Sequence, residues 1–216
     1  MPIVKVEDVH RTYQQGTVQV RALDGVDLEV EAGEFTVLMG SSGSGKTTLL
    51  NAIGGLDVPD AGKVIVDGTD LRTLSAAALS DLRLRKLGFV FQAYNLVPVL
   101  TAFENAEFVL LLQGMPAAER RTRVMKTLAD VGLAGMESRR PNELSGGQQQ
   151  RVAVARAIAG RPALVLADEP TANLDSKTGT ELIELMRTLN EDHGITFVFA
   201  THDPKVMDAA VIGAPD

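Results

Sequence analysis

The sequence predicts an α/β fold: a buried parallel sheet with an antiparallel β part at its N-terminal side and an inserted α-helical subdomain. Three observations predict this fold. Several short apolar runs lack polar alternation, as in strands that helices cover on both faces. Near the N-terminus, apolar and polar residues alternate, which is typical of half-buried antiparallel strands. From residue 92 to residue 155 the pattern instead predicts helices.

The N-terminal strands are predicted from this alternation. Val26, Leu28 and Val30 alternate with acidic residues. Turns are expected at residues 14–16 and at Asp67-Gly68, because glycine tolerates the backbone angles of a tight turn. We expect strands over residues 4–9, 18–23, 26–30 and 63–67.

The rest of the core follows from unbroken apolar runs and the helical segments between them. We expect buried strands over residues 35–39, 89–91, 163–167 and 195–200. Helices are expected over residues 46–54, 148–159 and 177–192. His193 is expected at the C-terminal end of the last helix, because Gly194 follows it and glycine commonly comes just after a helix.

The inserted segment contains two predicted helix starts. Thr101 and Glu104 have the spacing of a capping box, in which the two side chains satisfy free backbone N–H groups. Pro116 suits the first turn of a second helix that runs to Val131. We therefore divide one domain, residues 1–216, into a core (1–91 and 156–216) and a helical subdomain (92–155).

Composition narrows the range of functions. Lys and Arg total 21 against 28 Asp and Glu, a net charge of −7, and an acidic surface repels phosphate backbones, so we expect no nucleic-acid partner. The absence of cysteine excludes disulfides and thiolate metal sites. The densest apolar stretch, residues 108–112, is too short to span a bilayer, and the N-terminus has no signal-peptide pattern. We expect a soluble protein that reaches a membrane only through a partner.

A glycine-rich segment matches the full phosphate-loop pattern, with a buried strand expected before it and a helix after it. Its glycines let backbone N–H groups close around a phosphate, and the helix N-terminus adds its positive dipole end. Lys46 is expected to neutralise the β- and γ-phosphates, and the Thr47 hydroxyl to ligate Mg²⁺. The loop alone does not separate ATPases, kinases and GTPases, although the guanine-reading motif Asn-Lys-x-Asp is absent. The expected nucleotide-binding residues are Gly40, Ser41, Ser42, Gly43, Ser44, Gly45, Lys46, Thr47 and Thr48.

Two acidic residues follow the expected strand over residues 163–167. Carboxylates at the end of a buried strand are costly unless they meet cations or water. Asp168 is expected to hold Mg²⁺, directly or through water. Glu169 is expected to act as the general base toward the attacking water.

The segment Leu144–Arg151 opens an expected helix with Ser145 as its cap and two exposed glycine N–H groups, which makes a second anion site in the chain. Together with the two motifs above, Leu-Ser-Gly-Gly-Gln resembles the signature of the ABC ATPases. The resemblance covers nearly the whole chain and implies a P-loop NTPase core of the RecA-like type.

Further residues match this family in the expected order. Gln92, at the end of a strand, resembles the Q-loop glutamine, which is implied in catalysis and in Mg²⁺ coordination. Asp175 resembles the D-loop aspartate, and His202, in Thr201-His202-Asp203, resembles the switch histidine. Tyr13 occupies the position of the aromatic residue that stacks on adenine.

The resemblance implies a head-to-tail homodimer that closes around two ATP molecules. ATP would lie on the phosphate loop of one subunit, and the signature of the other would cap the γ-phosphate. The implied catalytic residues are Glu169, His202, Lys46 and Gln92. The implied Mg²⁺ ligands are Thr47, Gln92 and Asp168. The implied signature and D-loop contacts to nucleotide are Ser145, Gly146, Gly147, Gln148 and Asp175.

The chain also resembles one branch of the family, the lipoprotein-release and macrolide-export group. That resemblance implies a cytoplasmic ATPase that lies on the inner face of the cell membrane and drives a permease. The alternative is a non-transport regulator of the cell-division type, which transmits a signal through a membrane partner. Ala172 departs from the branch, which usually has glycine there, and the segment after Asp208 is shorter than the family pattern.

The apolar segment over residues 93–100 is hard to explain as a solvated loop. One explanation is that it belongs to the core of the helical subdomain. The resemblance implies another, a groove that receives a short helix of the permease, with Tyr94 and Leu96 among its contacts.

Overall fold

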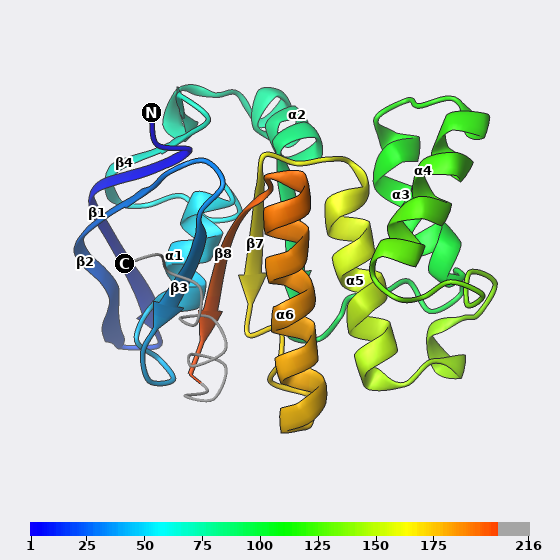
Figure 1. Cartoon of the computed structure of the whole chain (residues 1–216). Coiled ribbons are helices and arrows are strands. Elements are labelled where there is room, and N and C mark those ends of the chain that lie inside the picture. Colours follow the sequence, from blue (N-terminus) through cyan, green and yellow to red (C-terminus); the bar gives the residue numbers. More distant parts are fainter. Residues whose placement is uncertain (203–216) are drawn as a thin grey trace.

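The computed structural model describes residues 1–202 and contains two four-stranded sheets (Figure 1). The antiparallel sheet has the strand order β2-β1-β4-β5 and lies at one end of the molecule. Its strands are β1 (Val4–Gln15), β2 (Val18–Val30), β4 (Ala61–Val66) and β5 (Thr69–Asp70).

The two strands expected over residues 18–23 and 26–30 are a single strand, β2. Register shifts between Val6 and Thr12 of β1 accommodate the irregular pairing, so the ladder continues past Gly25. The turn at Asp67-Gly68 joins β4 to β5, and both of its residues have positive φ (48° and 74°).

The parallel sheet has the order β3-β8-β7-β6. Its strands are β3 (Phe35–Met39), β8 (Thr196–Thr201), β7 (Leu164–Asp168) and β6 (Leu87–Phe91). Because the strands pair in register, Met39, Thr201, Asp168 and Phe91 end at one edge. Segments that follow parallel strands meet at such an edge, which is where α/β proteins bind ligands.

Residues 1–202 contain six α-helices, of which α3 and α4 belong to the helical part on the right of Figure 1. Their bounds are α1 Lys46–Ile53, α2 Ala76–Lys86, α3 Ala102–Leu112, α4 Ala117–Asp130, α5 Gly146–Ala159 and α6 Ser176–His193. Two short 3₁₀ helices are η1 (Leu71–Thr73) and η2 (Pro141–Glu143).

The helix signals at Thr101 and His193 are confirmed, whereas Pro116 lies just before α4 (Ala117–Asp130) and not in its first turn. Thr101 and Glu104 form the capping box of α3, and α6 ends at His193 before Gly194 with φ 65°. Helix α2 was not predicted from the sequence. None of its residues is fully buried, and Leu79 and Leu82 pack only partly against the core, so its apolar periodicity is weak. Its local signals are the Ser75 cap and the basic residues of its last turn.

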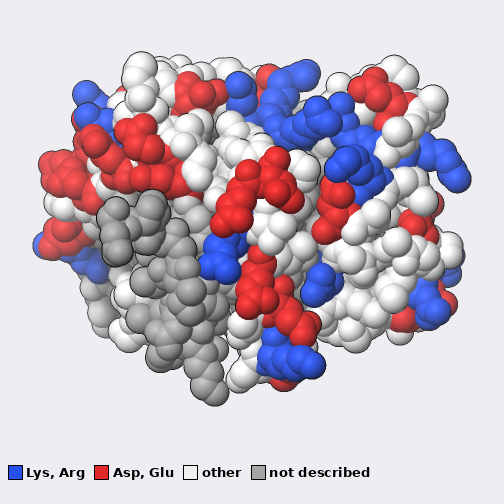
Figure 2. Space-filling model, viewed as in Figure 1, with Lys and Arg blue, Asp and Glu red and all other residues white. Residues whose placement is uncertain are grey.

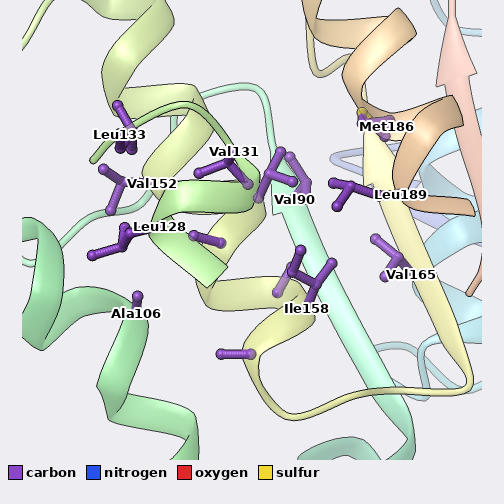
Figure 3. Close-up of a cluster of buried hydrophobic side chains, with 14 of the residues drawn as sticks. Val90, Ala106, Leu128, Val131, Leu133, Val152, Ile158, Val165, Met186 and Leu189 are labelled. Carbon is purple, nitrogen blue, oxygen red and sulfur yellow. The ribbon is translucent and has the colours of Figure 1, made fainter. Parts of the chain in front are cut away.

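Two buried clusters lie on opposite faces of the parallel sheet. Leu164 and Leu166 of β7 join α1 and the antiparallel sheet, whereas Val165 and Ala167 face the cluster formed with α5, α6 and the helical part (Figure 3). Strands buried on both faces explain why these runs do not alternate. Helix α5 crosses the expected boundary between residues 155 and 156 and contributes to this shared core, so the division into core and helical subdomain stays a prediction.

On the face shown in Figure 2, acidic side chains gather over the antiparallel sheet, and basic ones lie mainly along the upper part of the face toward the helical part. Among residues 1–202, no helix combines the length and apolar character needed to cross a bilayer. Asp203 and the short C-terminal segment after Asp208 lie outside the described residues.

Candidate functional site

The phosphate loop borders a cavity of about 390 Å³ at the carboxyl edge of the parallel sheet. The cavity brings together segments that lie far apart in the sequence. Its lining residues are Tyr13, Val20, Ala22, Ser42, Gly43, Ser44, Gly45, Lys46, Thr47, Thr48, Gln92, Glu169 and His202. The structure thus places most of the predicted site residues around one space.

The loop conformation depends on glycine at specific positions. Gly43 and Gly45 have φ values of 80° and 93°, a region that other residues rarely adopt. A Cβ on Gly45 would collide with the backbone oxygen of Ala22 on β2, so the loop also packs closely against the antiparallel sheet. This packing leaves the backbone open toward the cavity, as a phosphate cradle requires.

Lys46 is held by the loop itself. Its Nζ donates to the backbone oxygens of Gly40 at 2.6 Å and of Ser41 at 2.9 Å. These neutral acceptors do not compensate the ammonium charge, so a phosphate oxygen would be a stronger partner. The residues of the loop therefore fit a nucleoside triphosphate.

Thr47 and Asp168 meet at the first turn of α1. The Thr47 hydroxyl donates to Asp168 Oδ1 at 3.0 Å. Burial, and to a lesser extent the neighbouring charge of Glu169, raise the pKa of Asp168, while the Thr47 hydrogen bond and Lys46 act in the opposite direction. A hydroxyl beside one carboxylate suits Mg²⁺, which prefers few protein ligands together with phosphate oxygens and water.

Glu169 and His202 are in direct side-chain contact at the cavity. His202 Nδ1 lies 2.8 Å from Glu169 Oε1, and the side chains are 55% and 15% exposed. Glu169 has a positive φ of 47°, and its N–H donates to the oxygen of Ala200 on β8. The ends of β7 and β8 therefore hold the Glu169 carboxylate at the cavity. A general base at this position could accept a proton from water.

Gln92 lines the same cavity, immediately after β6. Its backbone oxygen accepts a hydrogen bond from Asn173 Nδ2 at 2.8 Å. This contact ties the Q-loop segment to the loop that follows Asp168 and Glu169. The roles of Gln92 in catalysis and Mg²⁺ coordination stay predictions.

The signature residues are arranged as predicted at the start of a helix. Ser145 caps α5 and forms a capping box with Gln148. Gly146 and Gly147 lie so close to Tyr94 and Thr178 that larger side chains would collide with them. Within the described chain, no residue of this signature lines the phosphate-loop cavity. Their contact to nucleotide therefore stays a prediction that needs a second subunit.

Asp175 is engaged elsewhere. Its carboxylate caps α6 by accepting the N–H groups of Lys177 and Thr178, each at 3.1 Å. These hydrogen bonds lower the pKa of Asp175, the one from the Thr178 hydroxyl contributing most. A role in nucleotide binding stays a prediction.

Three residues with structural roles at the site were not predicted. Gln150 is fully buried, and its Nε2 donates to the oxygen of Pro170 at 2.7 Å. Arg11 and Asp57 contact Tyr13 from behind the cavity. No local pattern signals the contacts of Gln150 and Asp57, because Gln150 lies 20 residues from Pro170, and Asp57 lies 44 residues from Tyr13 and 46 from Arg11.

A second, apolar cavity of about 410 Å³ lies between β6, α3 and α5. Its lining residues are Leu56, Arg83, Leu84, Leu87, Gly88, Phe89, Phe91, Asn95, Phe108, Val109, Leu112, Arg156 and Ala157. Tyr94 and Leu96 are not among them. The Leu96 side chain packs against the buried cluster instead, so for this residue the explanation by the subdomain core is the correct one.

The family follows from comparison with known proteins. The sequence profile described as "ABC transporter" matches residues 23–172. The chain belongs to the ABC transporter ATP-binding family. As an ABC ATPase it binds and hydrolyses ATP. The resemblance to this family that the sequence motifs predicted is thereby confirmed.

Named relatives place this ABC ATPase near the predicted branch. An uncharacterized ABC transporter ATP-binding protein of Thermotoga maritima is 50% identical over 95% of the chain and 88% of its own length. The lipoprotein-releasing system ATP-binding protein LolD of Anaeromyxobacter dehalogenans is 49% identical over 96% and 87%. The macrolide export ATP-binding/permease protein MacB of Brucella melitensis is 46% identical over 97% of this chain, which spans only 32% of that longer protein.

A solved structure confirms the fold of the ABC ATPase. The cassette MJ0796, described as dimeric in a post-hydrolysis state and bound to ADP and Pi, superposes with a TM-score of 0.87. It shares 46% identity and covers 95% of this chain and 90% of its own.

Proposed function

We propose that two copies of this ABC ATPase close head to tail around two Mg²⁺-bound ATP molecules and drive a membrane permease of the lipoprotein-release or macrolide-export type. The observation that supports the proposed dimer is that two anion-binding elements of one chain, the phosphate loop and the α5 N-terminus, do not line the same cavity. The phosphate loop lines its cavity, while the α5 N-terminus, with Ser145 and its glycines, does not. A two-fold dimer brings each α5 N-terminus to the other subunit's loop. The dimeric state described for MJ0796 supports this arrangement.

Each composite site combines the α5 N-terminus of one subunit, with Ser145, and the phosphate-loop side of the other. Lys46 would exchange its backbone acceptors for phosphate oxygens, and Thr47 and Asp168 would hold the Mg²⁺, which would supply positive charge to neutralise the phosphates. Glu169 accepts the proton of the attacking water, while the His202 contact at 2.8 Å keeps the carboxylate in place. Hydrolysis separates the γ-phosphate that links the two subunits. The dimer then opens, because the products of hydrolysis no longer favour the closed dimer over the open one as ATP does.

A complementation experiment tests the head-to-tail arrangement. We expect Lys46→Ala and Ser145→Arg proteins each to lack ATPase activity on their own. A mixed dimer contains one site in which the intact phosphate loop faces the intact signature, so mixing the two proteins should restore activity. Activity that is not restored by mixing would favour a site built within one chain. Mixtures of the wild-type protein with each variant control for the change in activity that comes from diluting one protein with another.

The permease is proposed to dock in the apolar cavity between β6, α3 and α5. Phe108 and Leu112 are 45% and 57% exposed there, and Phe91 at its floor leads directly into Gln92. Exposed apolar side chains around one concave surface favour a helix in a groove. The LolD and MacB relatives support a permease partner, and such a partner places the ATPase at the cytoplasmic face of a membrane.

A matched pair of α3 variants tests this docking. Leu112→Asp changes the groove, whereas Leu111→Asp changes an equally exposed residue (50%) of the same helix outside it. We expect Leu112→Asp to lower permease-stimulated ATPase activity and recovery of the complex, with basal activity unchanged. Leu111→Asp should behave like wild type. Equal effects of both variants would place the docking surface elsewhere.

A further inference from the structure

Tyr13 is held by two charged residues that do not line the nucleotide cavity. Its hydroxyl donates to Asp57 Oδ2 at 2.5 Å. The Arg11 guanidinium lies 4.8 Å from the centre of the Tyr13 ring, a cation–π distance. Arg11 in turn donates to both oxygens of Asp57, at 2.6 and 3.0 Å. The three side chains therefore form a closed triangle, which we call the tyrosine clamp.

The clamp connects Tyr13 to the helix that carries the phosphate loop. Asp57 follows α1, and its N–H donates to the oxygen of Asn51 within that helix at 3.2 Å. Asp60 adds a second attachment by accepting the N–H of Thr12 and a hydrogen bond from Arg11, both at 2.7 Å. Because α1 begins at Lys46, the clamp fixes the tyrosine ring relative to the phosphate-binding residues.

Arg11 and Asp57, the two ionisable residues that hold Tyr13, are partly buried and charged. Burial acts to lower the pKa of Arg11, but its hydrogen bonds to Asp60, Tyr13 and Asp57 outweigh this and raise it. Burial likewise acts to raise the pKa of Asp57, but the hydrogen bonds from Tyr13 and Arg11 lower it. The Arg11 and Asp57 side chains are only 24% and 22% exposed, so their geometry is restricted.

We propose that Arg11 and Asp57 are positioning residues for the nucleoside of ATP: they hold the Tyr13 ring so that the base stacks on it while the phosphates occupy the loop. The proposal rests on the stacking role of Tyr13. Arg11 lies over the ring and Asp57 holds the hydroxyl, while Tyr13, Val20 and Ala22 remain as the lining of the cavity next to the loop. A ring held in this way binds a base at a lower entropic cost than a freely rotating one.

The test compares a ligand that carries a base with one that does not. Binding of ATP and of inorganic tripolyphosphate is measured by calorimetry for the wild type, Asp57→Asn, Tyr13→Phe and Tyr13→Ala. We expect Asp57→Asn to weaken ATP binding by about two- to tenfold, the range for the loss of one hydrogen bond, and to leave tripolyphosphate binding unchanged. Tyr13→Phe should have the same effect, and the double variant should be no weaker than either single one.

Further variants separate positioning from a general effect on folding. Arg11→Lys keeps the charge but loses the bidentate contact to Asp57, so it should retain part of the ATP affinity, whereas Arg11→Met should lose more. Asp24→Asn serves as the control, because Asp24 is an ion-paired carboxylate of the same sheet that contacts Arg21 and His10 rather than Tyr13. Equal losses for ATP and tripolyphosphate would show a structural staple only and overturn the proposal.

The outcomes also distinguish the stacking role of Tyr13 from the positioning role of Arg11 and Asp57. If Tyr13→Ala leaves ATP binding unchanged, the stacking role itself is wrong. If Tyr13→Ala weakens ATP binding but Asp57→Asn and Arg11→Met do not, stacking holds and the positioning role is wrong.

Discussion

At the scale of single residues, the charged side chains of this site already have partners within the protein. Lys46 donates to backbone oxygens of its own loop, and Asp168 accepts from Thr47. Glu169 contacts His202, so, like Asp168 with Thr47, it is paired with another predicted site residue. The site is thus largely preorganised for a ligand that brings both negative and positive charge.

The raised pKa of Asp168 leads to a prediction about stability. Because the folded-state pKa lies above its usual value of 3.8, the ionised carboxylate lowers stability, and this loss develops as pH rises through the interval between the two pKa values. We expect Asp168→Asn to raise the melting temperature of the nucleotide-free protein at pH 7 but to abolish Mg²⁺-dependent hydrolysis. The gain should disappear below pH 3.8, where Asp168 is protonated in both states. A variant that is less stable than wild type at pH 7 would contradict this account.

At the scale of elements, helix starts carry both stability and function. Both α3 and α5 open with a capping box, in which Thr101 Oγ1 and Ser145 Oγ accept a backbone N–H at 3.2 and 3.3 Å. The two caps are chemically alike, yet only the second belongs to the signature. Comparison of the two therefore separates the stability of a cap from its function.

We expect Thr101→Ala and Ser145→Ala to lose similar stability, about 0.5–2 kcal/mol each, because each removes one side-chain cap. Only Ser145→Ala should lower ATPase activity in addition, since its hydroxyl is proposed to face the γ-phosphate of the other subunit. Denaturant unfolding and steady-state turnover measure the two effects. If both variants lose activity equally, cap stability rather than nucleotide contact explains the effect of Ser145.

At the scale of the whole molecule, the parallel sheet holds the site by bringing distant segments to one edge. Gln92, Glu169 and His202 follow three neighbouring strands, β6, β7 and β8. The signature on α5 packs against the same sheet through the buried cluster that contains Val152 and Val165 (Figure 3). A change at the site can therefore reach the helical part through continuous packing.

The proposed dimer predicts a trapped state. Glu169→Gln removes the general base, so hydrolysis should slow by about 10²–10⁴-fold while ATP still binds. Size-exclusion chromatography with ATP and Mg²⁺ should then show a dimer. Lys46→Ala in the same background removes the phosphate contact and should restore the monomer. A Glu169→Gln protein that stays monomeric at every ATP concentration would contradict the nucleotide-bridged dimer.

Much of the fold was determined by local patterns that need no tertiary information. The capping box at Thr101, the glycine after His193 and the non-alternating strands all depend on side chains close in sequence, and all three are confirmed. The phosphate loop and signature could be predicted for the same reason, because their chemistry needs backbone N–H groups from adjacent residues. The family assignment followed from these motifs and is confirmed.

Only the tertiary structure decided which distant residues support the site. Helix α2 was missed because its apolar side chains are only partly buried and its periodicity is weak, and β2 was divided in two because a bulge interrupts its alternation without ending the strand. Asp57 lies 44 residues from Tyr13 and 46 from Arg11 in the sequence, and the Leu96 side chain proved to pack against the buried cluster. Such contacts depend on how strands and helices come together in space, and no periodicity in the sequence encodes that arrangement.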